Sequence, residues 1–296
     1  MNAPFQSGQL ILHPPSGGRG WRIVPPQPLP VERLLLGRRA EEALRLVPLL
    51  FNVCAAAQRV AVRAAFGLPD DDRERQALAA ERMREHRRKL WFELPALMGL
   101  EGGGAERRLA EETPAGLESW TRRAGAAGAA LRRLMAWPEG IGRVHLPLLD
   151  TAPDWPRPLC GGAPVENSLA VLWRGHPLLD WIEARRGRGP VWRFVLRLLD
   201  HSALAGGADP GSGAVAARGR LLVRAELEGG RVRRFDRLTP TDFLVVPDGL
   251  LARLVEGLAA DDPRLPVLVA LADPCVSWII RQEADEAAER GGCAHA

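Results

Sequence analysis

The chain has four cysteines, a residue type that can hold a soft metal ion or react as a nucleophile. They lie far apart in the sequence, and in a reducing compartment such thiols are free or bind metal instead of forming disulfides. Cys160 falls in a segment rich in Pro and Gly. Cys293 and His295 form a Cys-x-His pair in the tail, and such a pair near a terminus is more often incidental than a metal site. Cys54 and Cys275 therefore remain as the candidate metal ligands.

The sequence next to each candidate also fits a simpler role. Cys54 lies in a segment rich in Leu and Ala, and Cys275 follows Asp273 and Pro274 after a run of apolar residues. Free cysteine is among the most buried residue types, so each local pattern by itself favours a buried apolar thiol over a ligand. Both roles stay open at this point.

The segments that must position these cysteines are predicted to be mainly helical. Apolar residues at helical spacing predict one long helix, or two in series, over residues 31–66, with Cys54 on or near the apolar side and an end at Gly67. A second helix is predicted from Asp70, because carboxylates favour the first turn, and Pro95 is expected to limit it. Further helices are predicted over residues 106–135, 166–204 and 248–260, and a short last one from 273–275.

One spacing in the second helix indicates an ion pair. Glu85 and Lys89 are four residues apart, which brings their side chains together on a helix surface. Lys89 is also the one lysine among 40 basic residues. We expect this pair on the solvated face.

Two segments are predicted to contain short strands. Residues 8–30 alternate β-type runs with Gly and Pro, which predicts a hairpin or edge strands. Residues 220–224 and 231–235 flank Glu228, Gly229 and Gly230 as in a β-hairpin. We therefore predict a mainly α (α+β) fold, with a helical-bundle core and small antiparallel sheet elements, in a single domain over 1–296. Its parts are an arm of short strands (1–30), a mainly helical part (31–204), a hairpin region (205–245) and C-terminal helices with the Asp-Pro-Cys motif (246–296).

The composition argues against several classes of function. Apolar residues make up 46% and charged residues 26%, close to the average of globular proteins. The net charge is +4, but the arginines are scattered among Asp and Glu, so we expect a solvated surface and no nucleic-acid partner. No run approaches the roughly 20 apolar residues that span a bilayer, and the N-terminus lacks a signal-like pattern, so we expect no membrane insertion and a cytoplasmic location.

Several motifs, taken in order, resemble the large subunit of [NiFe] hydrogenases. Cys54 lies where that family has its early Cys-x-x-Cys pair, and Asp273-Pro274-Cys275 matches the family's Asp-Pro-Cys-x-x-Cys-x-x-His near the C-terminal end. Between them come counterparts of the Pro-Arg-Gly segment, the hairpin and the Pro-Ser/Thr segment, at residues 217–221, 228–232 and 238–241. Residues 166–170 are a weaker match to the Glu-x-Gly-Pro-Leu-Ala-Arg motif, with Val171 where the Arg would be. The resemblance covers about residues 30–66 and 160–281, and it implies a truncated large-subunit-like fold in which Cys54 meets Cys275.

The departures from that pattern fall on metal ligands. Phe51 and Trp278 stand where the family has a further cysteine in each pair, while Gln58 and Arg281 stand where it has histidines. The resemblance implies that Cys54 and Cys275 correspond to one bridging and one terminal thiolate of a four-thiolate site. Two thiolates do not supply the nickel site, so we expect no nickel and no enzyme activity, with Phe51 and Trp278 as core side chains. Gln58 is left with two roles, a hydrogen bond to bound metal or simple packing.

This pattern of losses resembles the HupK/HoxV type of hydrogenase accessory protein, which is thought to carry an Fe(CN)2(CO) unit to the apo enzyme. The resemblance implies that Cys54 and Cys275 bind the iron and that Arg218, Pro240 and Thr241 form the cofactor-binding surface. Arg218 and Thr241 would donate hydrogen bonds to the cyanide nitrogens. Arg218 would also favour deprotonation of the thiols.

The implied partners are the [NiFe] hydrogenase large subunit precursor and maturation proteins of the HypC/HypD type. Two other functions stay open. The chain could be a metal-free chaperone whose likeness to the large subunit serves only to bind maturation proteins or hydrogenase subunits. A hydrogenase-like enzyme ranks last, because it requires ligands that this sequence lacks.

Overall fold

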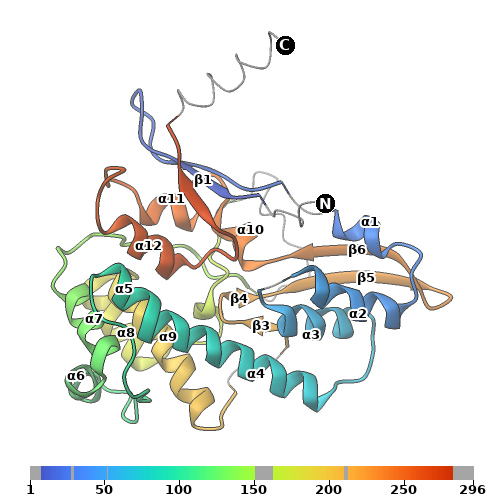
Figure 1. Cartoon of the computed structure of the whole chain (residues 1–296), viewed down its shortest axis with the longest axis horizontal. Coiled ribbons are helices and arrows are strands. Elements are labelled where there is room, and N and C mark those ends of the chain that lie inside the picture. The colour runs from blue at the N-terminus through green and yellow to red at the C-terminus, as the bar shows by residue number, and fades with distance from the viewer. Residues whose placement is uncertain (1–7, 28–29, 52, 151–162, 210–212, 283–296) are drawn as a thin grey trace.

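Helices dominate the chain, which confirms the predicted mainly α fold class (Figure 1). We describe a computed structural model that covers residues 8–27, 30–51, 53–150, 163–209 and 213–282. The helices are α1 (Val31–Leu35), α2 (Ala40–Leu50), α3 (Ala55–Ala65), α4 (Asp72–Arg87), π-helix η1 (Arg88–Glu93), α5 (Leu94–Leu97), α6 (Pro114–Arg123), α7 (Gly125–Met135), 3-10 helix η2 (Leu169–Val171), α8 (Pro177–Arg186), α9 (Pro190–Ala205), α10 (Pro240–Leu244), α11 (Leu250–Leu254) and α12 (Leu265–Ala272).

The helix predicted over 31–66 is divided into three. Gly37, in the left-handed region at φ 77°, separates α1 from α2, and the backbone becomes extended at Phe51. Cys54 is itself left-handed, at φ 60°, and directly precedes α3. The predicted end at Gly67 is confirmed by its φ of 64°. Cys54 therefore lies in the break between α2 and α3, where its backbone departs from helical geometry.

The second predicted helix begins as expected but does not end at Pro95. Asp71 caps α4, since its carboxylate accepts hydrogen bonds from the N–H groups of Arg73 and Glu74. The helix then passes through η1 and continues into α5, where Pro95 lies in the first turn. Pro95 directly follows the π-helix, where the Leu94 N–H donates to the carbonyl of Lys89 five residues earlier instead of four. The helix therefore continues to Leu97.

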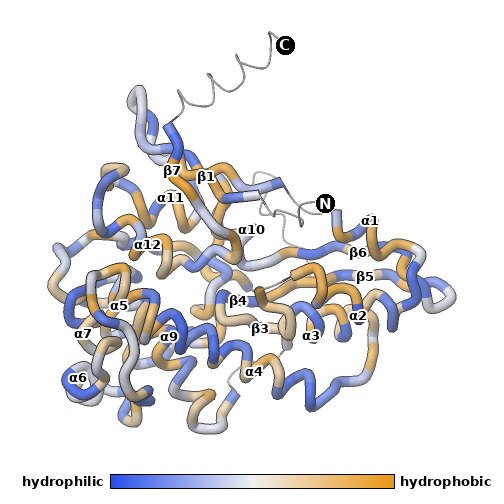
Figure 2. Tube along the Cα trace, in the orientation of Figure 1, coloured by the Kyte–Doolittle hydropathy of each residue, from blue (hydrophilic) through white to orange (hydrophobic). Residues whose placement is uncertain are grey.

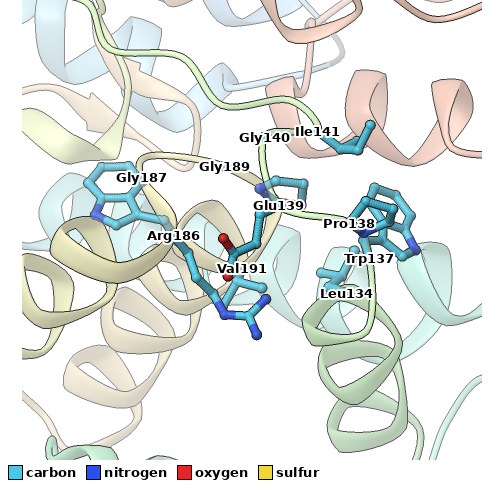
Figure 3. A pocket seen from close by; sticks show the side chains of 12 residues that line it. Leu134, Trp137, Pro138, Glu139, Gly140, Ile141, Arg186, Gly187, Gly189 and Val191 are labelled. Carbon is cyan, nitrogen blue, oxygen red and sulfur yellow. The ribbon is translucent and has the colours of Figure 1, made fainter.

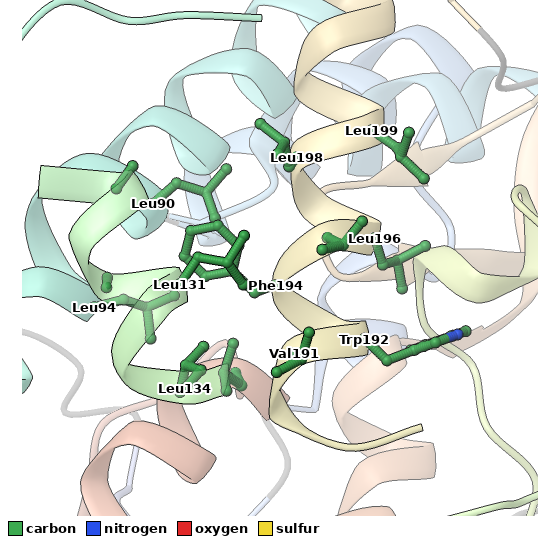
Figure 4. Close-up of a cluster of buried hydrophobic side chains, with 14 of the residues drawn as sticks. Leu90, Leu94, Leu131, Leu134, Val191, Trp192, Phe194, Leu196, Leu198 and Leu199 are labelled. Carbon is green, nitrogen blue, oxygen red and sulfur yellow. The ribbon is translucent and has the colours of Figure 1, made fainter. Parts of the chain in front are cut away.

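The later helices are shorter than predicted. The segment 106–135 contains α6 and α7, which begin only at Pro114, and 166–204 contains η2, α8 and α9. Helix α9 is almost completely buried and packs against η1, α5 and α7 in the largest apolar cluster of the described chain (Figure 4). Its labelled members in Figure 4 are Leu90, Leu94, Leu131, Leu134, Val191, Trp192, Phe194, Leu196, Leu198 and Leu199.

Both predicted hairpins are confirmed. Strands β1 (Leu10–His13) and β2 (Arg22–Val24) pair antiparallel, as do β5 (Leu222–Glu228) and β6 (Arg231–Leu238). Gly229 and Gly230 form the turn of the second hairpin with φ of 57° and 72°, a conformation that glycine adopts without strain. Two shorter strands, β3 (Val215–Ala216) and β4 (Gly219–Arg220), form a further antiparallel pair on either side of Arg218.

The C-terminal region differs from the prediction. The segment after Cys275 forms strand β7 (Trp278–Ile280) instead of a short helix. This strand pairs in parallel with β1, with Leu10 opposite Trp278, so the first sheet is mixed and not purely antiparallel. The parallel partner is supplied by the other end of the chain, 268 positions away, so the sequence around 278–280 carries no hairpin signal for it. The pairing holds the Asp-Pro-Cys segment against the N-terminal sheet.

Two apolar layers flank the segment that carries Cys54. The hairpin β5–β6 covers α1, α2 and α3 (Figure 1). Val232 and Phe235 of the hairpin belong to one buried apolar cluster with Val47 and Val62. Helices α11 and α12 pack on β1, through the apolar residues that Figure 2 shows along α12 and β1. The start of α3, the β3–β4 turn and the end of α12 are thereby brought to one place.

Candidate functional site

Cys54 is a nearly buried thiol at the start of α3. Its side chain is 8% exposed, and its sulfur accepts a hydrogen bond from Nη1 of Arg218 at 3.3 Å. The first N–H groups of α3, which would otherwise favour a thiolate, donate instead to the carboxylate of Glu81, from Ala56 at 2.9 Å and Ala57 at 3.3 Å.

Burial decides the protonation of Cys54. It raises the pKa of the thiol to about 12, and the negative charges of Glu81 and Cys275 add to the rise. Arg218 acts in the opposite direction, as expected from the sequence, but it does not outweigh burial. Arg218 thus favours deprotonation of the thiol, but burial has the larger effect on its pKa. Cys275 lies near enough for its charge to act on Cys54.

Cys275 is half-buried and fixed by Thr241. The Thr241 hydroxyl donates to the Cys275 sulfur at 3.0 Å and accepts a hydrogen bond from the Cys275 backbone N–H at 3.1 Å. Thr241 is the second residue of α10, which begins at Pro240 after the Thr239 cap, whose hydroxyl and N–H both engage Asp242. A short capped helix thus holds the hydroxyl against the thiol.

Asp273, two residues before Cys275, is the centre of a buried ionic cluster. It ends α12 in the left-handed region at φ 57°, and its carboxylate meets Lys89 at 2.9 Å, Arg197 at 2.9 Å and Arg218 at 3.3 Å. Burial opposes ionisation of Asp273, but the three cations outweigh it and hold the pKa far below its ordinary value. The sequence analysis assigned Asp273 no role, and no local signal reveals these partners.

The expected pair of Glu85 and Lys89 does not form. Lys89 is 3% exposed and donates to Glu93 at 2.6 Å as well as to Asp273, whereas Glu85 contacts Arg88 at 3.2 Å and Arg218 at 3.0 Å. The cause is η1, which begins at residue 88 and changes the direction of the side chains that follow. The π-helix turns Lys89 into the core.

The predicted site residues are brought together in two linked pairs. Arg218 contacts Cys54, Thr241 contacts Cys275, and the ion pair of Arg218 with Asp273 connects the two. Arg218, Pro240 and Thr241 also line one hollow of about 300 Å³ that opens to solvent. The other lining residues are Val165, Glu166, Asn167, Ser168, Phe243, Leu244, Leu250, Ala272 and Asp273, so the faint motif at 166–170 reaches the same hollow.

The four residues that replace metal ligands of the large-subunit motifs have different surroundings in the structure. Phe51 and Trp278, expected in the core, are only half-buried, and the guanidinium of Arg237 lies 4.3 Å from the centre of the Phe51 ring. Gln58 is 3% exposed, and its Oε1 has no hydrogen-bond partner within the described part of the chain. Arg281 donates its backbone N–H to Leu12 beside β7. Cys160 and Cys293 lie outside the described residues.

A second hollow is lined by other residues (Figure 3). It is formed by the end of α7, the loop after it and the turn between α8 and α9, with Trp137 and Arg186 among its side chains. None of the candidate residues lines it. In the residues that the structure describes, no group of three or more His, Cys, Asp or Glu side chains is arranged to hold a metal ion. No helix there is long and apolar enough to span a membrane.

Comparison with known proteins identifies relatives over nearly the whole chain. The sequence is 35% identical to the hydrogenase expression/formation protein HupK of Rhodobacter capsulatus, over 92% of this chain and 97% of that protein. It is 31% identical to HupK of Azotobacter vinelandii, over 86% and 92%, and 30% identical to the hydrogenase expression/formation protein HupV of Azotobacter chroococcum mcd 1, over 85% and 90%. No family model matches the sequence.

Solved structures with the same fold are hydrogenases. The Ni-Fe-Se hydrogenase from D. vulgaris Hildenborough in the reduced state matches with a TM-score of 0.56 and 13% identity, over 87% of this chain and 93% of that chain. The [NiFeSe] hydrogenase of Dm. baculatum matches with a TM-score of 0.53 and 14% identity, over 87% and 94%. The likeness confirms the hydrogenase large-subunit-like fold that the motifs imply. With the curated relatives, it shows that the chain belongs to the family of HupK hydrogenase expression/formation proteins.

Proposed function

We propose that the chain acts in [NiFe] hydrogenase formation as a non-catalytic carrier of an Fe(CN)2(CO) unit, which Cys54 and Cys275 hold through their sulfurs. One observation carries the proposal. Each of the two sulfurs already meets one hydrogen-bond donor, Arg218 at Cys54 and Thr241 at Cys275, and the resemblance assigns these same two donors to the cyanide ligands. The names of the relatives support the wider role in hydrogenase formation.

The donor set fits this cargo. Low-spin Fe(II) that carries diatomic ligands favours soft donors, and two thiolates from distant segments provide them. A cyanide bound through carbon presents its nitrogen lone pair outward, which is costly in a buried place unless a donor meets it. The guanidinium of Arg218 and the hydroxyl of Thr241 are such donors, and Pro240 offers the apolar surface that suits a carbonyl ligand.

Binding must displace a proton from Cys54. With a pKa of about 12 the thiol is protonated at neutral pH, and a thiolate is the form that binds metal. The hydrogen bond from Arg218 to the sulfur stabilises the thiolate once it forms. Cargo binding should therefore release a proton, and affinity should increase with pH.

The test is an infrared spectrum of the protein purified without oxygen from a host that expresses the hydrogenase maturation proteins. We expect cyanide and carbonyl bands in the wild type and in Cys293→Ser, and none in Cys54→Ser or Cys275→Ser. Iron analysis of the same samples gives a second readout. A spectrum without bands, from wild-type protein that still restores hydrogenase activity in a deletion strain, would overturn the carrier role.

A metal-free chaperone is the second candidate, and the protonated state of Cys54 favours it, since a buried neutral thiol is stable without metal. In that case the large-subunit-like fold would serve to bind the partners of the large subunit. Complementation separates the two functions. If Cys54→Ser and Cys275→Ser variants still support hydrogenase formation at the wild-type level, the chaperone role is correct and the carrier role is not.

The proposal includes the partners and the place of action. We infer that the chain works in the cytoplasm with the hydrogenase large subunit precursor and with maturation proteins of the HypC/HypD type. Affinity purification of the tagged chain from a strain that lacks nickel uptake, where the precursor accumulates, tests both contacts. Recovery of neither protein would contradict this part of the proposal.

A further inference from the structure

Arg237 is a charged residue on the apolar face of a hairpin. In β6 it follows Phe235 by two positions and lies opposite Val223 of β5, so these three residues share one face. Phe235 and Val223 belong to the apolar cluster that packs on α1, α2 and α3. Arg237 therefore lies at a register position where an apolar residue would be the ordinary choice.

The other face of the same hairpin shows the usual treatment of arginine. Asp236 forms ion pairs with Arg224 at 3.0 Å and with Arg234 at 2.8 Å, and the three side chains are partly exposed to solvent. Arg237 is different. Within the described residues no carboxylate lies at ion-pair distance from it, and Asp242 and Glu32 act on it only from farther away.

The surroundings of Arg237 point toward the candidate site. Arg237 is half-buried, and its guanidinium lies 4.3 Å from the centre of the ring of Phe51, which is three residues before Cys54. Arg237 also lies four positions before Thr241, whose hydroxyl donates to the Cys275 sulfur at 3.0 Å. The charge of Cys275 acts on it, and burial lowers its pKa from the ordinary value. Stacking on an aromatic ring holds a guanidinium in place but leaves its edge N–H groups unused. A cation desolvated in this way is costly unless an anion binds to it.

The geometry points to a small-anion subsite at Cys275: the guanidinium of Arg237, held on Phe51, receives the negative charge of an occupant bound at the Cys275 sulfur. The inference deepens the proposed function and rests on it for the identity of the natural occupant. Arg218 is shared between Asp273, Glu85 and the Cys54 sulfur, whereas Arg237 has no such carboxylate partner within the described residues and can offset charge that the cargo brings at Cys275.

Alkylation of Cys275 by two reagents of similar size but different charge tests the subsite. Both react in the same way, because the thiolate forms a C–S bond, iodide leaves, and the thiol proton passes to the buffer. We expect negatively charged iodoacetate to label Cys275 faster, relative to neutral iodoacetamide, in the wild type than in Arg237→Gln. Peptide mass spectrometry of the full chain reads the label at Cys275 separately from the other cysteines.

One charge across a partly screened gap should change the ratio of the two rates by roughly five- to tenfold at low salt. Arg237→Lys retains the charge and should retain most of the ratio. Arg233→Gln is the matched control on the same strand, since Arg233 is exposed and pairs with Glu228, and it should leave the ratio unchanged. Circular dichroism and equal labelling of Cys54 identify variants that remain folded.

Two results would overturn the subsite. One is an unchanged ratio in folded Arg237→Gln. The other, which needs no variant, is a wild-type ratio that does not decrease when salt is raised to about 1 M, where the Debye length is near 3 Å. The assay uses protein without cargo. Selective labelling together with an infrared spectrum without bands therefore supports the subsite and contradicts the iron carrier. Cyanide and carbonyl bands together with unselective labelling support the carrier and contradict the subsite.

Discussion

Nη1 of Arg218 lies 3.3 Å from the sulfur of Cys54, although 164 positions separate the two residues. The same guanidinium contacts Glu85 of α4 and Asp273 at the end of α12. One side chain thus connects the start of α3, the last turn of α4 and the Asp-Pro-Cys segment. We expect the stability of the site to depend on this connection.

Replacing Arg218 by Met should lower the free energy of unfolding by about 3 kcal/mol. This is the lower part of the range for breaking a buried ion pair, because Lys89 and Arg197 still neutralise Asp273. Urea denaturation measures the change. Arg122→Met is the control: Arg122 and Glu118 are both more than 60% exposed, and its effect should stay within about 0.5 kcal/mol. Equal effects of the two substitutions would contradict the structural role of Arg218.

Asp273→Asn should be more destabilising than Arg218→Met. Asparagine tolerates the left-handed backbone at φ 57°, so the change removes charge without adding strain. It leaves three buried cations without their shared carboxylate, with an expected loss of roughly 3–5 kcal/mol. A double variant with Lys89→Met should lose less than the sum of the single variants, since it removes one of the unpaired charges. Strict additivity in denaturation experiments would contradict this coupling.

Thr241→Val should lower the reactivity of Cys275. Valine has nearly the shape of threonine but lacks the hydroxyl that donates to the Cys275 sulfur and accepts from its backbone N–H. We expect slower labelling of Cys275 by iodoacetamide, because the reactive thiolate loses the hydroxyl that donates to its sulfur. We also expect a loss of about 1–3 kcal/mol in stability, because a backbone N–H is left unpaired. Thr241→Ser retains the hydroxyl and should resemble the wild type in both measurements. If serine and valine behave alike, the hydroxyl has no such role.

Stability should decrease in acid because of the buried cluster between α4 and α9. Asp200 meets His86 at 2.7 Å and Arg82 at 2.5 Å. Burial opposes its ionisation, but the His86 hydrogen bond and the Arg82 charge lower its pKa to about 2 from an ordinary 3.8. A lowered pKa gives stability that is present above about pH 4 and is lost as pH falls toward 2, here about 2 kcal/mol.

Asp200→Asn is the test of this acid dependence. Asparagine does not ionise, so the variant should be less stable at neutral pH, and its unfolding free energy should change less than that of the wild type between pH 4 and 2. His86 adds a separate decrease nearer neutral pH, since burial lowers its pKa and protonation then favours the unfolded chain. Denaturation curves measured across this pH range provide the data. Parallel curves for variant and wild type would contradict the assignment to Asp200.

Local sequence was sufficient for the elements that depend on neighbouring residues. The two hairpins, the start of α4 near Asp70 and the end of α3 at Gly67 follow from turn and cap chemistry, which acts within a few residues. The same reasoning did not place the break before Cys54 or the continuation past Pro95. Packing between distant segments decides both, and it outweighs local helix preference.

The site divides in the same way. The sequence by itself determined that two of the four cysteines stand in recognisable motifs, and that Arg218, Pro240 and Thr241 belong with them. Only the tertiary structure decided which donor meets which sulfur, because the partners are 164 and 34 positions apart. Burial raises the pKa of Cys54 by more than Arg218 lowers it, and burial is also a property of the whole fold.

The remaining charges of the site were invisible in the sequence. Lys89 was expected on the solvated face, and nothing in the sequence distinguished Arg237 from the other arginines. In the structure a π-helix directs Lys89 into the core, and the strand register directs Arg237 onto Phe51. The direction of the Lys89 side chain depends on the number of residues per helical turn, and that of Arg237 on which face of the strand it occupies. The sequence alone does not determine these side-chain directions, because a shift of one residue in a strand exchanges its buried and exposed faces. The packed structure fixes them.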